Sequence, residues 1–388
     1  MKFFRLLLKN LFRNKLRTAL TVSSIAASIF LVAVLISLLD GLTNPPETPD
    51  SALRLITRHK ISLFNTLPVG YREKIAALEG VDAVIGSMWF GGMYDNSGVD
   101  QMLAQFAVDT DQFFIVNPDM VLAEDQREAF LQDRGGAIVG NVLADSFGWK
   151  VGDRIHTRSN LWPIEPLELN IRGIYQGGGD QGGGVYYHWD YFDKAIKEAG
   201  IGDSFTGTFS IRARSAEDVP RIAAKVDALF ENSSSPTKTE TEKAFILGFL
   251  SMMGNVQLLI SGICTAILFA VILVAANTMA MSIRERTREI GIMKALGFRR
   301  IHVLSLLLFE SVLLAFIGSA LGAVLAQLLL DNANLAMQSS GMVPNLRVGA
   351  GILLFCKGIG VLVGFVAAGV PAFRAANRPV VEAIRNVA

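Results

Sequence analysis

The chain has 388 residues, of which 51% are hydrophobic and only 18% are charged, against roughly 25% charged residues in typical soluble domains. This composition excludes an ordinary soluble protein and indicates segments that lie in a membrane. The net charge of +1 says little by itself because the charges are sorted by segment, and we expect no nucleic-acid partner.

At the N-terminus, residues 3–16 have the composition of an amphipathic helix lying on the membrane surface. Apolar side chains such as Phe3, Leu7 and Leu11 can enter the head-group boundary while the neighbouring cations face anionic lipid. The alternative is that these cations only set the topology. No small-residue cleavage pattern follows the first apolar segment, so we expect no cleavable signal peptide.

Four apolar segments are each long enough to cross a bilayer. Residues 18–39 carry no charged side chain over 22 positions, which at ~1.5 Å per residue gives a helix of about 33 Å. The predicted organisation begins with an interfacial helix (1–17), transmembrane helix 1 (18–42) and an extracytoplasmic domain (43–237). A stalk helix continuous with transmembrane helix 2 (238–283), a cytoplasmic segment (284–300) and transmembrane helix 3 (301–330) follow. The chain then continues through a short external loop (331–347), transmembrane helix 4 (348–371) and a cytoplasmic tail (372–388).

The distribution of charge predicts the orientation of these segments. Six cations and no acid precede the first span, and six cations outnumber Glu285 and Glu289 between the second and third spans. Residues 40–243 instead carry 19 Lys and Arg against 30 Asp and Glu. Lys and Arg collect in short cytoplasmic segments beside spans. We therefore expect both termini and residues 284–300 in the cytoplasm of a bacterial cell, with the large insert outside its inner membrane.

The insert has the sequence pattern of an α+β domain. Strands are predicted at 81–88, 105–108, 113–116, 137–140, 167–175 and 209–213, and helices at 67–78, 118–133, 141–147, 190–199 and 216–230. Because strands occur in both halves of the insert, the domain is expected to have two lobes. The predicted fold class is thus an α-helical membrane protein with four transmembrane helices and a two-lobed α+β extracytoplasmic domain between helices 1 and 2.

Several common chemical sites have no support in the sequence. The Gly-rich loop at 176–184 has no Lys and lies between predicted strands, so a flexible loop, or a contact with a partner, fits it better than a phosphate site. The four histidines are scattered, and both cysteines fall inside spans. We expect no catalytic residue, bound metal or cofactor, and no enzyme active in its own right.

The strongest local pattern is residues 282–302, which read SIRERTREIGIMKALGFRRIH. Ile283, Ile290, Met293 and Leu296 can share one stripe of a helix, with the charged residues opposite, and Gly297 is a suitable helix end. The structural alternative is an ordinary cytoplasmic loop that follows the charge rule. A short amphipathic helix with a glycine stop can instead transmit a push without entering the bilayer.

This segment closely resembles that of the FtsX/MacB-type permeases of ABC transporters, which reads like RxRxxEIGILRALG. Residues 371–385 also resemble the closing motif of that family, with one residue missing before Pro379, and parts of the insert resemble its external domain. The resemblance implies a coupling helix that docks on the ATPase subunit. The residues implied are Arg286, Arg288, Glu289, Gly291, Lys294 and Gly297. No GxxxxGK[ST] motif occurs, so ATP and magnesium are expected on a separate ABC ATPase subunit.

Two ionisable residues and two sets of small residues stand out within the spans. Glu310 and Lys357 are expected to pair with each other, or else to snorkel and hydrogen-bond separately. Close helix packing is predicted at Gly318, Gly322, Gly360 and Gly364. That packing serves either one subunit or a permease dimer, which the sequence leaves open as homodimer or heterodimer.

Three functions are compatible with the resemblance. The first is an export permease that transmits ATP hydrolysis to its external domain, with a periplasmic adaptor protein as a possible partner. The second is a permease that extracts lipoproteins or lipids from the outer leaflet, for which membrane lipids are partners. The third is a signalling scaffold that regulates envelope enzymes, and this reading expects a smaller external domain.

Overall fold

The computed structural model describes residues 15–44, 48–96, 99–177, 183–252, 254–337 and 346–379. The chain divides into two units, which are considered separately. The helical unit comprises residues 1–41, 255–332 and 346–388, and the inserted domain comprises residues 42–254 together with 333–345. The predicted interfacial helix at 3–16 falls almost entirely outside the described residues.

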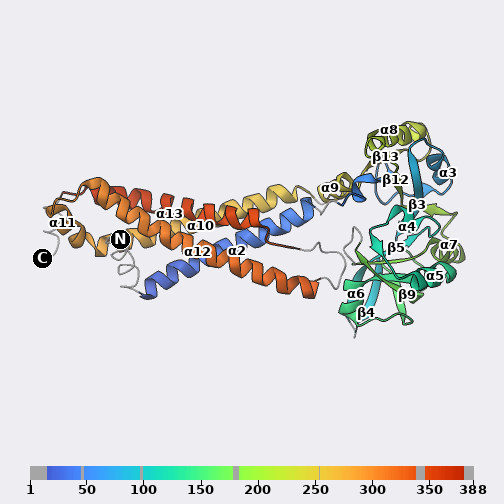
Figure 1. Ribbon diagram of the computed structural model, residues 1–388, viewed down its shortest axis with the longest axis horizontal. Helices are drawn as coiled ribbons and strands as arrows, with labels where there is room; N and C mark the ends of the chain where they lie inside the picture. The colour runs from blue at the N-terminus through green and yellow to red at the C-terminus, as the bar shows by residue number, and fades with distance from the viewer. Residues whose placement is uncertain are drawn as a thin grey trace. The chain divides into compact units, whose positions relative to one another are not determined.

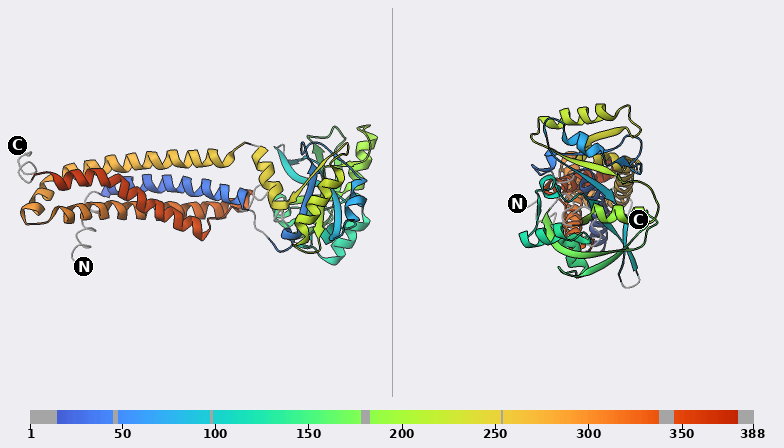
Figure 2. Two further views of the ribbon diagram at one scale, coloured as in Figure 1. Left: turned by 90° about the horizontal axis from the view of Figure 1, so that it is seen from above. Right: turned by 90° about the vertical axis from the view of Figure 1, so that its right-hand side faces the viewer.

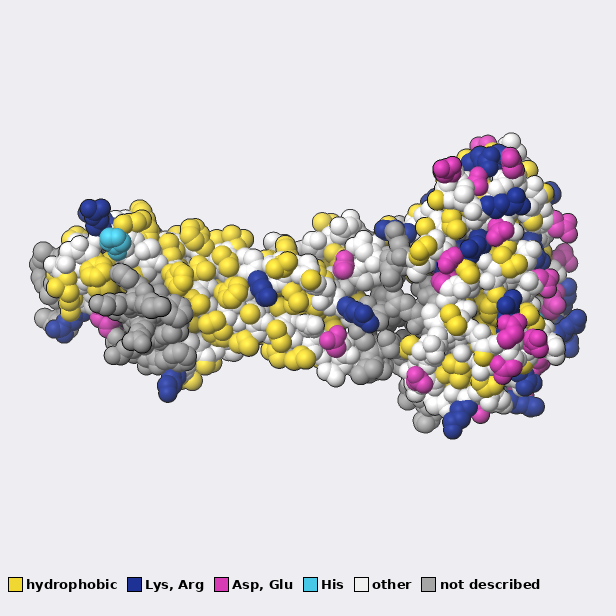
Figure 3. Space-filling view, in the orientation of Figure 1, with side chains coloured by type: hydrophobic (Ala, Val, Ile, Leu, Met, Phe, Trp, Pro, Cys, Tyr) yellow, Lys and Arg dark blue, Asp and Glu magenta, His cyan; other side chains and the backbone are white. Residues whose placement is uncertain are grey.

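Four long helices form the helical unit and run side by side (Figures 1 and 2). They are α2 (Lys15–Thr43), α10 (Val256–Glu285), α12 (Arg300–Met337) and α13 (Ala350–Asn377). Each is long and apolar enough to cross a membrane. Hydrophobic side chains cover most of the visible face of this unit, as expected of a surface that contacts lipid (Figure 3). A short helix, α11 (Thr287–Ala295), joins α10 to α12.

Small residues allow the long helices to approach closely. A Cβ atom added to Gly322 would lie 2.3 Å from the Ala26 carbonyl oxygen, so α12 contacts the backbone of α2. A Cβ added to Gly360 would lie 2.2 Å from the Ser319 Oγ atom, and one on Gly364 2.7 Å from the Val312 Cα atom. The glycines therefore lie at helix contacts within one chain, where any side chain would push the helices apart.

Six strands of the inserted domain pair in a closed ring. The order is β10 (Gly184–His188), β7 (Gly136–Gly140), β9 (Leu167–Gly177), β8 (Arg154–Ser159), β4 (Gly92–Asn96) and β5 (Val99–Val108), which pairs back with β10. The β10–β5 and β7–β9 pairs are parallel and the other pairs in the ring are antiparallel. Phe90, Tyr187 and Phe192 belong to the apolar core associated with this ring.

A second group of strands continues from β5. It runs through β3 (Val81–Trp89), β12 (Thr208–Ala213), β1 (Arg54–His59) and β13 (Thr237–Thr241), all antiparallel. Helices α3 (Tyr71–Ala76) and α8 (Asp218–Phe230) cover it, and the rings of Tyr71 and Phe230 stack 3.8 Å apart. This separate core gives the second lobe, and the predicted α+β class with four membrane helices is confirmed.

Shorter elements complete the inserted domain. They are η1 (Ser51–Leu53), β2 (Leu67–Pro68), α4 (Phe113–Val116), β6 (Met120–Val121), α5 (Glu124–Gln132), α6 (Asn141–Phe147), α7 (Trp189–Glu198), β11 (Phe205–Thr206) and α9 (Glu242–Met252). The strand β9 alternates between buried and partly exposed side chains over most of its length, which confirms the strand read from that alternation.

Two local predictions are wrong. Residues 113–116 form the helix α4 instead of a strand, because Phe113 and Val116 are both buried at a helical spacing; a short apolar run does not distinguish the two. The stalk helix from residue 238 into the second span does not form either. The Thr-rich segment 237–241 pairs with β1, and Gly254, with φ +98°, lies between α9 and α10.

The observed boundaries of other elements differ from the predicted boundaries by a few residues. The helix predicted at 67–78 begins at Tyr71, after the short strand β2, and the one predicted at 118–133 begins at Glu124, after β6. Residues 178–182, the centre of the Gly-rich loop, lie outside the described residues.

Candidate functional site

The short helix α11 has a defined beginning and end. Arg286 separates it from α10 with a non-helical backbone (φ −106°, ψ 12°). At the other end Gly297 has φ +92°, its N–H donates to the Lys294 carbonyl, and the Phe298 N–H donates to the Met293 carbonyl. This pair of bonds is a Schellman motif, in which a glycine takes the left-handed conformation. The sequence therefore sets the length of α11 through one glycine.

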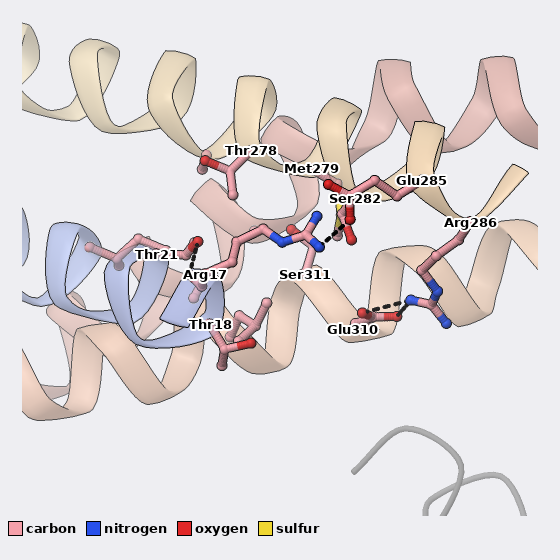
Figure 4. A pocket seen from close by; sticks show the side chains of 15 residues that line it. Arg17, Thr18, Thr21, Thr278, Met279, Ser282, Glu285, Arg286, Glu310 and Ser311 are labelled. Carbon is pink, nitrogen blue, oxygen red and sulfur yellow. Dashed lines mark hydrogen bonds and ion pairs between the residues drawn. The ribbon is translucent and has the colours of Figure 1, made fainter. Parts of the chain in front are cut away.

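Arg286 binds α12 through a buried ion pair. Its Nη1 atom donates to both carboxylate oxygens of Glu310, at 3.0 and 2.9 Å (Figure 4). Its Nε atom donates to Glu289 at 3.2 Å. The Arg286 and Glu310 side chains are only 12% and 7% exposed. A carboxylate this deep needs a charged or hydrogen-bonding partner. The structure thus pairs Glu310 with Arg286, and the predicted pair with Lys357 is not formed.

The absence of the predicted ion pair between Glu310 and Lys357 has a geometric reason. Both oxygens of Glu310 are occupied by a guanidinium that the break between α10 and α11 places beside it. Lys357 is half-buried on α13 and forms no ion pair among the described residues. The prediction from the sequence did not include the rotation of each helix about its axis, which decides the direction of a side chain.

A second ion pair lies beside the first. Arg17 of α2 donates to Glu285 at the end of α10. Both pairs line a cavity of about 220 Å³ at one end of the helical unit, together with the hydroxyl groups of Thr18, Thr21, Thr278, Ser282 and Ser311 (Figure 4). Two arginines and two glutamates balance the formal charge of the lining. From the sequence, Arg17 counts only among the six cations before the first span, and its ion pair with Glu285 is not predicted.

Lys294 attaches α11 to the last membrane helix. Its Nζ atom donates to the carbonyl oxygens of Ala376, at 2.9 Å, and Arg378, at 2.6 Å. The last carbonyls of a helix have no partner within the helix, so a Lys side chain is well suited to this position. Burial, and to a lesser degree the nearby charge of Arg300, lower the pKa of Lys294 below its ordinary value.

Apolar packing holds the inner face of α11. Ile290 belongs to a buried cluster with Met279 and Ile283 of α10, Val303 and Leu307 of α12, and Ala368, Ala372 and Ala375 of α13. Gly291 is also buried. Together with Arg286 and Lys294, these contacts fix α11 to three membrane helices.

The outer face of α11 is exposed and partly apolar. Ile292 is 47% exposed and Leu296 is 75% exposed, and Arg288 is exposed beside them. The predicted stripe is wrong at Leu296, which follows the last turn of α11 and does not pack with Ile290. Of the six residues predicted for coupling, Arg286, Gly291 and Lys294 thus face the bundle, Glu289 binds Arg286, Gly297 ends the helix, and Arg288 faces outward.

Within the residues that the structure describes, no group of three or more His, Cys, Asp or Glu could hold a metal ion. Arg17, Glu285, Arg286, Glu289 and Glu310 form ion pairs with one another.

Two family models match this chain. The FtsX-like permease C-terminal family model matches residues 261–380, which include α11 and the ion-paired Glu285, Glu289 and Glu310. The MacB-like periplasmic core domain model matches residues 18–229, more than half of the chain. Together the two matches cover all four spans and most of the inserted domain.

Individual relatives have related descriptions. The uncharacterized ABC transporter permease MJ1507 of Methanocaldococcus jannaschii is 23% identical over 97% of this chain and 96% of its own length. The pyoverdine export ATP-binding/permease protein PvdT of Pseudomonas syringae pv. tomato is 24% identical over 96% of this chain, which spans 58% of PvdT. The permease YknZ of Bacillus subtilis is 31% identical over 49% of this chain and 47% of its own length.

Solved structures include the periplasmic region of MacB from Actinobacillus actinomycetemcomitans. It is 10% identical, with a TM-score of 0.37, over 56% of this chain and 97% of the MacB chain. The two family matches, which between them include the inserted domain and the coupling segment, carry the assignment. This chain belongs to the FtsX/MacB family of ABC transporter permeases and is a multi-pass membrane protein.

Proposed function

We propose that this chain is the permease subunit of an export complex and that α11 is its coupling helix. The observation that carries the proposal is the attachment of one short helix to three membrane helices, through Arg286, Ile290 and Lys294. A helix held in this way moves the bundle when it is pushed. ATP and magnesium are bound by a separate ABC ATPase subunit in this proposal.

The orientation follows from the charge distribution. The cation-rich segment around α11 and both termini lie in the cytoplasm of a bacterial inner membrane, and the acidic inserted domain lies outside. The ATPase then meets the exposed side chains of Ile292 and Leu296, which extend beyond the anchored face. Apolar side chains at the centre of such a contact supply most of its affinity.

Export is the output that the relatives favour. The names of PvdT and of the MacB proteins describe export of pyoverdine and of macrolides. We extend only the class to this chain, namely export of a substrate from the periplasm or the outer leaflet. The working unit is a dimer of permeases, as a homodimer or with a similar chain, and a periplasmic adaptor completes the path.

Replacement of Leu296 by Glu tests the coupling assignment. The substitution places a charge on the outer face of α11 without touching its anchored face. We expect the variant to fold but to lose most of the ATPase that co-purifies with the wild-type chain. The matched control is Leu229→Glu, since Leu229 is a 47% exposed leucine of the inserted domain. Retention of the ATPase and of ATP-driven export by Leu296→Glu would show that this face does not dock the ATPase.

A further inference from the structure

A second cavity of about 150 Å³ lies between the adjoining ends of α10, α11 and α13. Four cations line it, Arg284, Lys294, Arg374 and Arg378, and no carboxylate is among the described lining residues. None of the four forms an ion pair within the described residues. Like charges collected around one small space repel one another, which an anionic occupant would relieve.

The nearby carboxylates bind arginines that do not line this cavity. Glu285 binds Arg17, and Glu289 binds Arg286. The junction of α10 and α11 therefore separates its charges, with balanced ion pairs on one side and unbalanced cations on the other. This separation explains why neighbouring acids do not neutralise Arg284 although they lie next to it in the sequence.

The cavity lies where the membrane helices change from apolar to polar. The uncharged run of α10 ends at Ile283, and that of α13 ends shortly after Val370. Both residues line the cavity, and Val370 is 62% exposed. Phe373, one turn further along α13, is 60% exposed. An occupant that carries an anion and an apolar tail would match both the cations and this apolar flank.

We propose that this cavity binds the phosphate of one anionic phospholipid, with the acyl chains lying along the exposed flank of α13. Basic pockets between membrane helices are typical sites for anionic head groups. Guanidinium groups bind phosphate oxygens in bidentate geometry. Lys294 has one of its three donors left after its two bonds to carbonyl groups. The inference requires only that the helices span a bilayer and does not depend on the coupling role.

The bound lipid would have a structural consequence. It touches residues of α10, α11 and α13 at once, so it adds a third connection between α11 and the end of α13, beside Lys294 and the apolar cluster. Since anionic lipids are concentrated in the cytoplasmic leaflet, the site would be filled in the orientation proposed above.

Lipid binding to the purified full-length chain tests the proposal. Native mass spectrometry in a neutral detergent would measure dissociation constants for phosphatidylglycerol and for phosphatidylcholine with the same acyl chains. The test variant is Arg374→Gln with Arg378→Gln, and the control is Arg288→Gln with Arg299→Gln, which removes two exposed cations that do not line the cavity. At about fivefold per cation near a membrane surface, the test variant should bind phosphatidylglycerol about thirtyfold more weakly. The control variant should change the dissociation constant for phosphatidylglycerol less than about twofold.

Further arms of the experiment separate the alternatives. Glycerol 1-phosphate should not displace the lipid at matched concentration; if it binds as tightly as phosphatidylglycerol, the site takes free phosphate and the lipid proposal is overturned. Equal binding of the two lipids, or an equal loss in both variants, also overturns it. A test variant that keeps lipid affinity but loses the co-purifying ATPase would assign the cations to the ATPase contact instead. Arg284→Gln alone should weaken binding about fivefold, which guards against a folding defect in the double variant.

Discussion

The pair between Arg286 and Glu310 allows a quantitative test of the coupling site. Replacement of Glu310 by Gln leaves the 12% exposed guanidinium of Arg286 with only Glu289 as an ionic partner. Removal of one partner from a buried ion pair costs about 3–5 kcal/mol. We expect a value of about 3 kcal/mol because Glu289 remains, which shifts the folding equilibrium on the order of 150-fold.

The size of the effect distinguishes an ion pair from an ordinary contact. Hydrogen bonds between membrane helices average only about 0.6 kcal/mol. The double variant Arg286→Met with Glu310→Leu removes both charges, and apolar replacement of a buried pair is often neutral or stabilising. The double variant should therefore be more stable than Glu310→Gln and close to the wild-type chain.

The assay is unfolding of the full-length chain by increasing SDS in mixed micelles, followed by far-ultraviolet circular dichroism. Tryptophan fluorescence supplies an internal control, because all four tryptophans lie in the inserted domain. It should not change with these substitutions. The control cycle combines Lys357→Met with Glu310→Gln, for which we expect no coupling.

Two results would refute the reasoning. One is a coupling energy below about 0.5 kcal/mol in the cycle formed by Arg286→Met, Glu310→Leu and their double variant, the range of error for independent sites. The other is a coupling between Lys357 and Glu310 as large as that of the observed pair, which would restore the pairing expected from the sequence.

Three other predictions concern packing, pH and orientation. Gly322→Ala should destabilise the helical unit by about 1–3 kcal/mol through overpacking, because its Cβ would lie 2.3 Å from a backbone oxygen. Gly358→Ala is the control and should not destabilise the unit, because its Cβ would have nothing within 4 Å. Equal stability of the two variants in SDS would contradict the helix contact. Burial would raise the pKa of Glu240, but hydrogen bonds from Lys238 and Arg58 lower it below its ordinary 4.5. A carboxyl group with a lowered pKa stabilises the folded state at pH values above its unfolded pKa, and this stabilisation is lost as the pH falls through its folded pKa. The stability of Glu240→Gln, monitored by tryptophan fluorescence, should therefore fall less steeply below about pH 4.5 than that of the wild type. Parallel curves would contradict the assigned cause. Cysteines introduced at the exposed positions Glu79 and Arg288 should react with an impermeant maleimide from opposite sides of the membrane; labelling from the same side would overturn the orientation.

The sequence alone determined the features that depend on local composition. Membrane spans follow from the length of uncharged runs, and Gly297 marks the end of α11 because only a residue that tolerates positive φ fits there. The α+β class of the insert followed from strand and helix periodicities. The family resemblance rested on contiguous motifs, which the two family matches confirm.

The tertiary structure decided which distant groups meet. The partner of Glu310 is Arg286 because α10 breaks at that arginine and turns it toward α12, a rotation that hydropathy does not encode. The segment at 237–241 became a strand because β1 offered it an edge, although its sequence could continue a helix. The division of the α10–α11 charges between two cavities likewise arises from helix packing. Such outcomes depend on contacts between residues far apart in the chain, whose energies are not visible in any single segment.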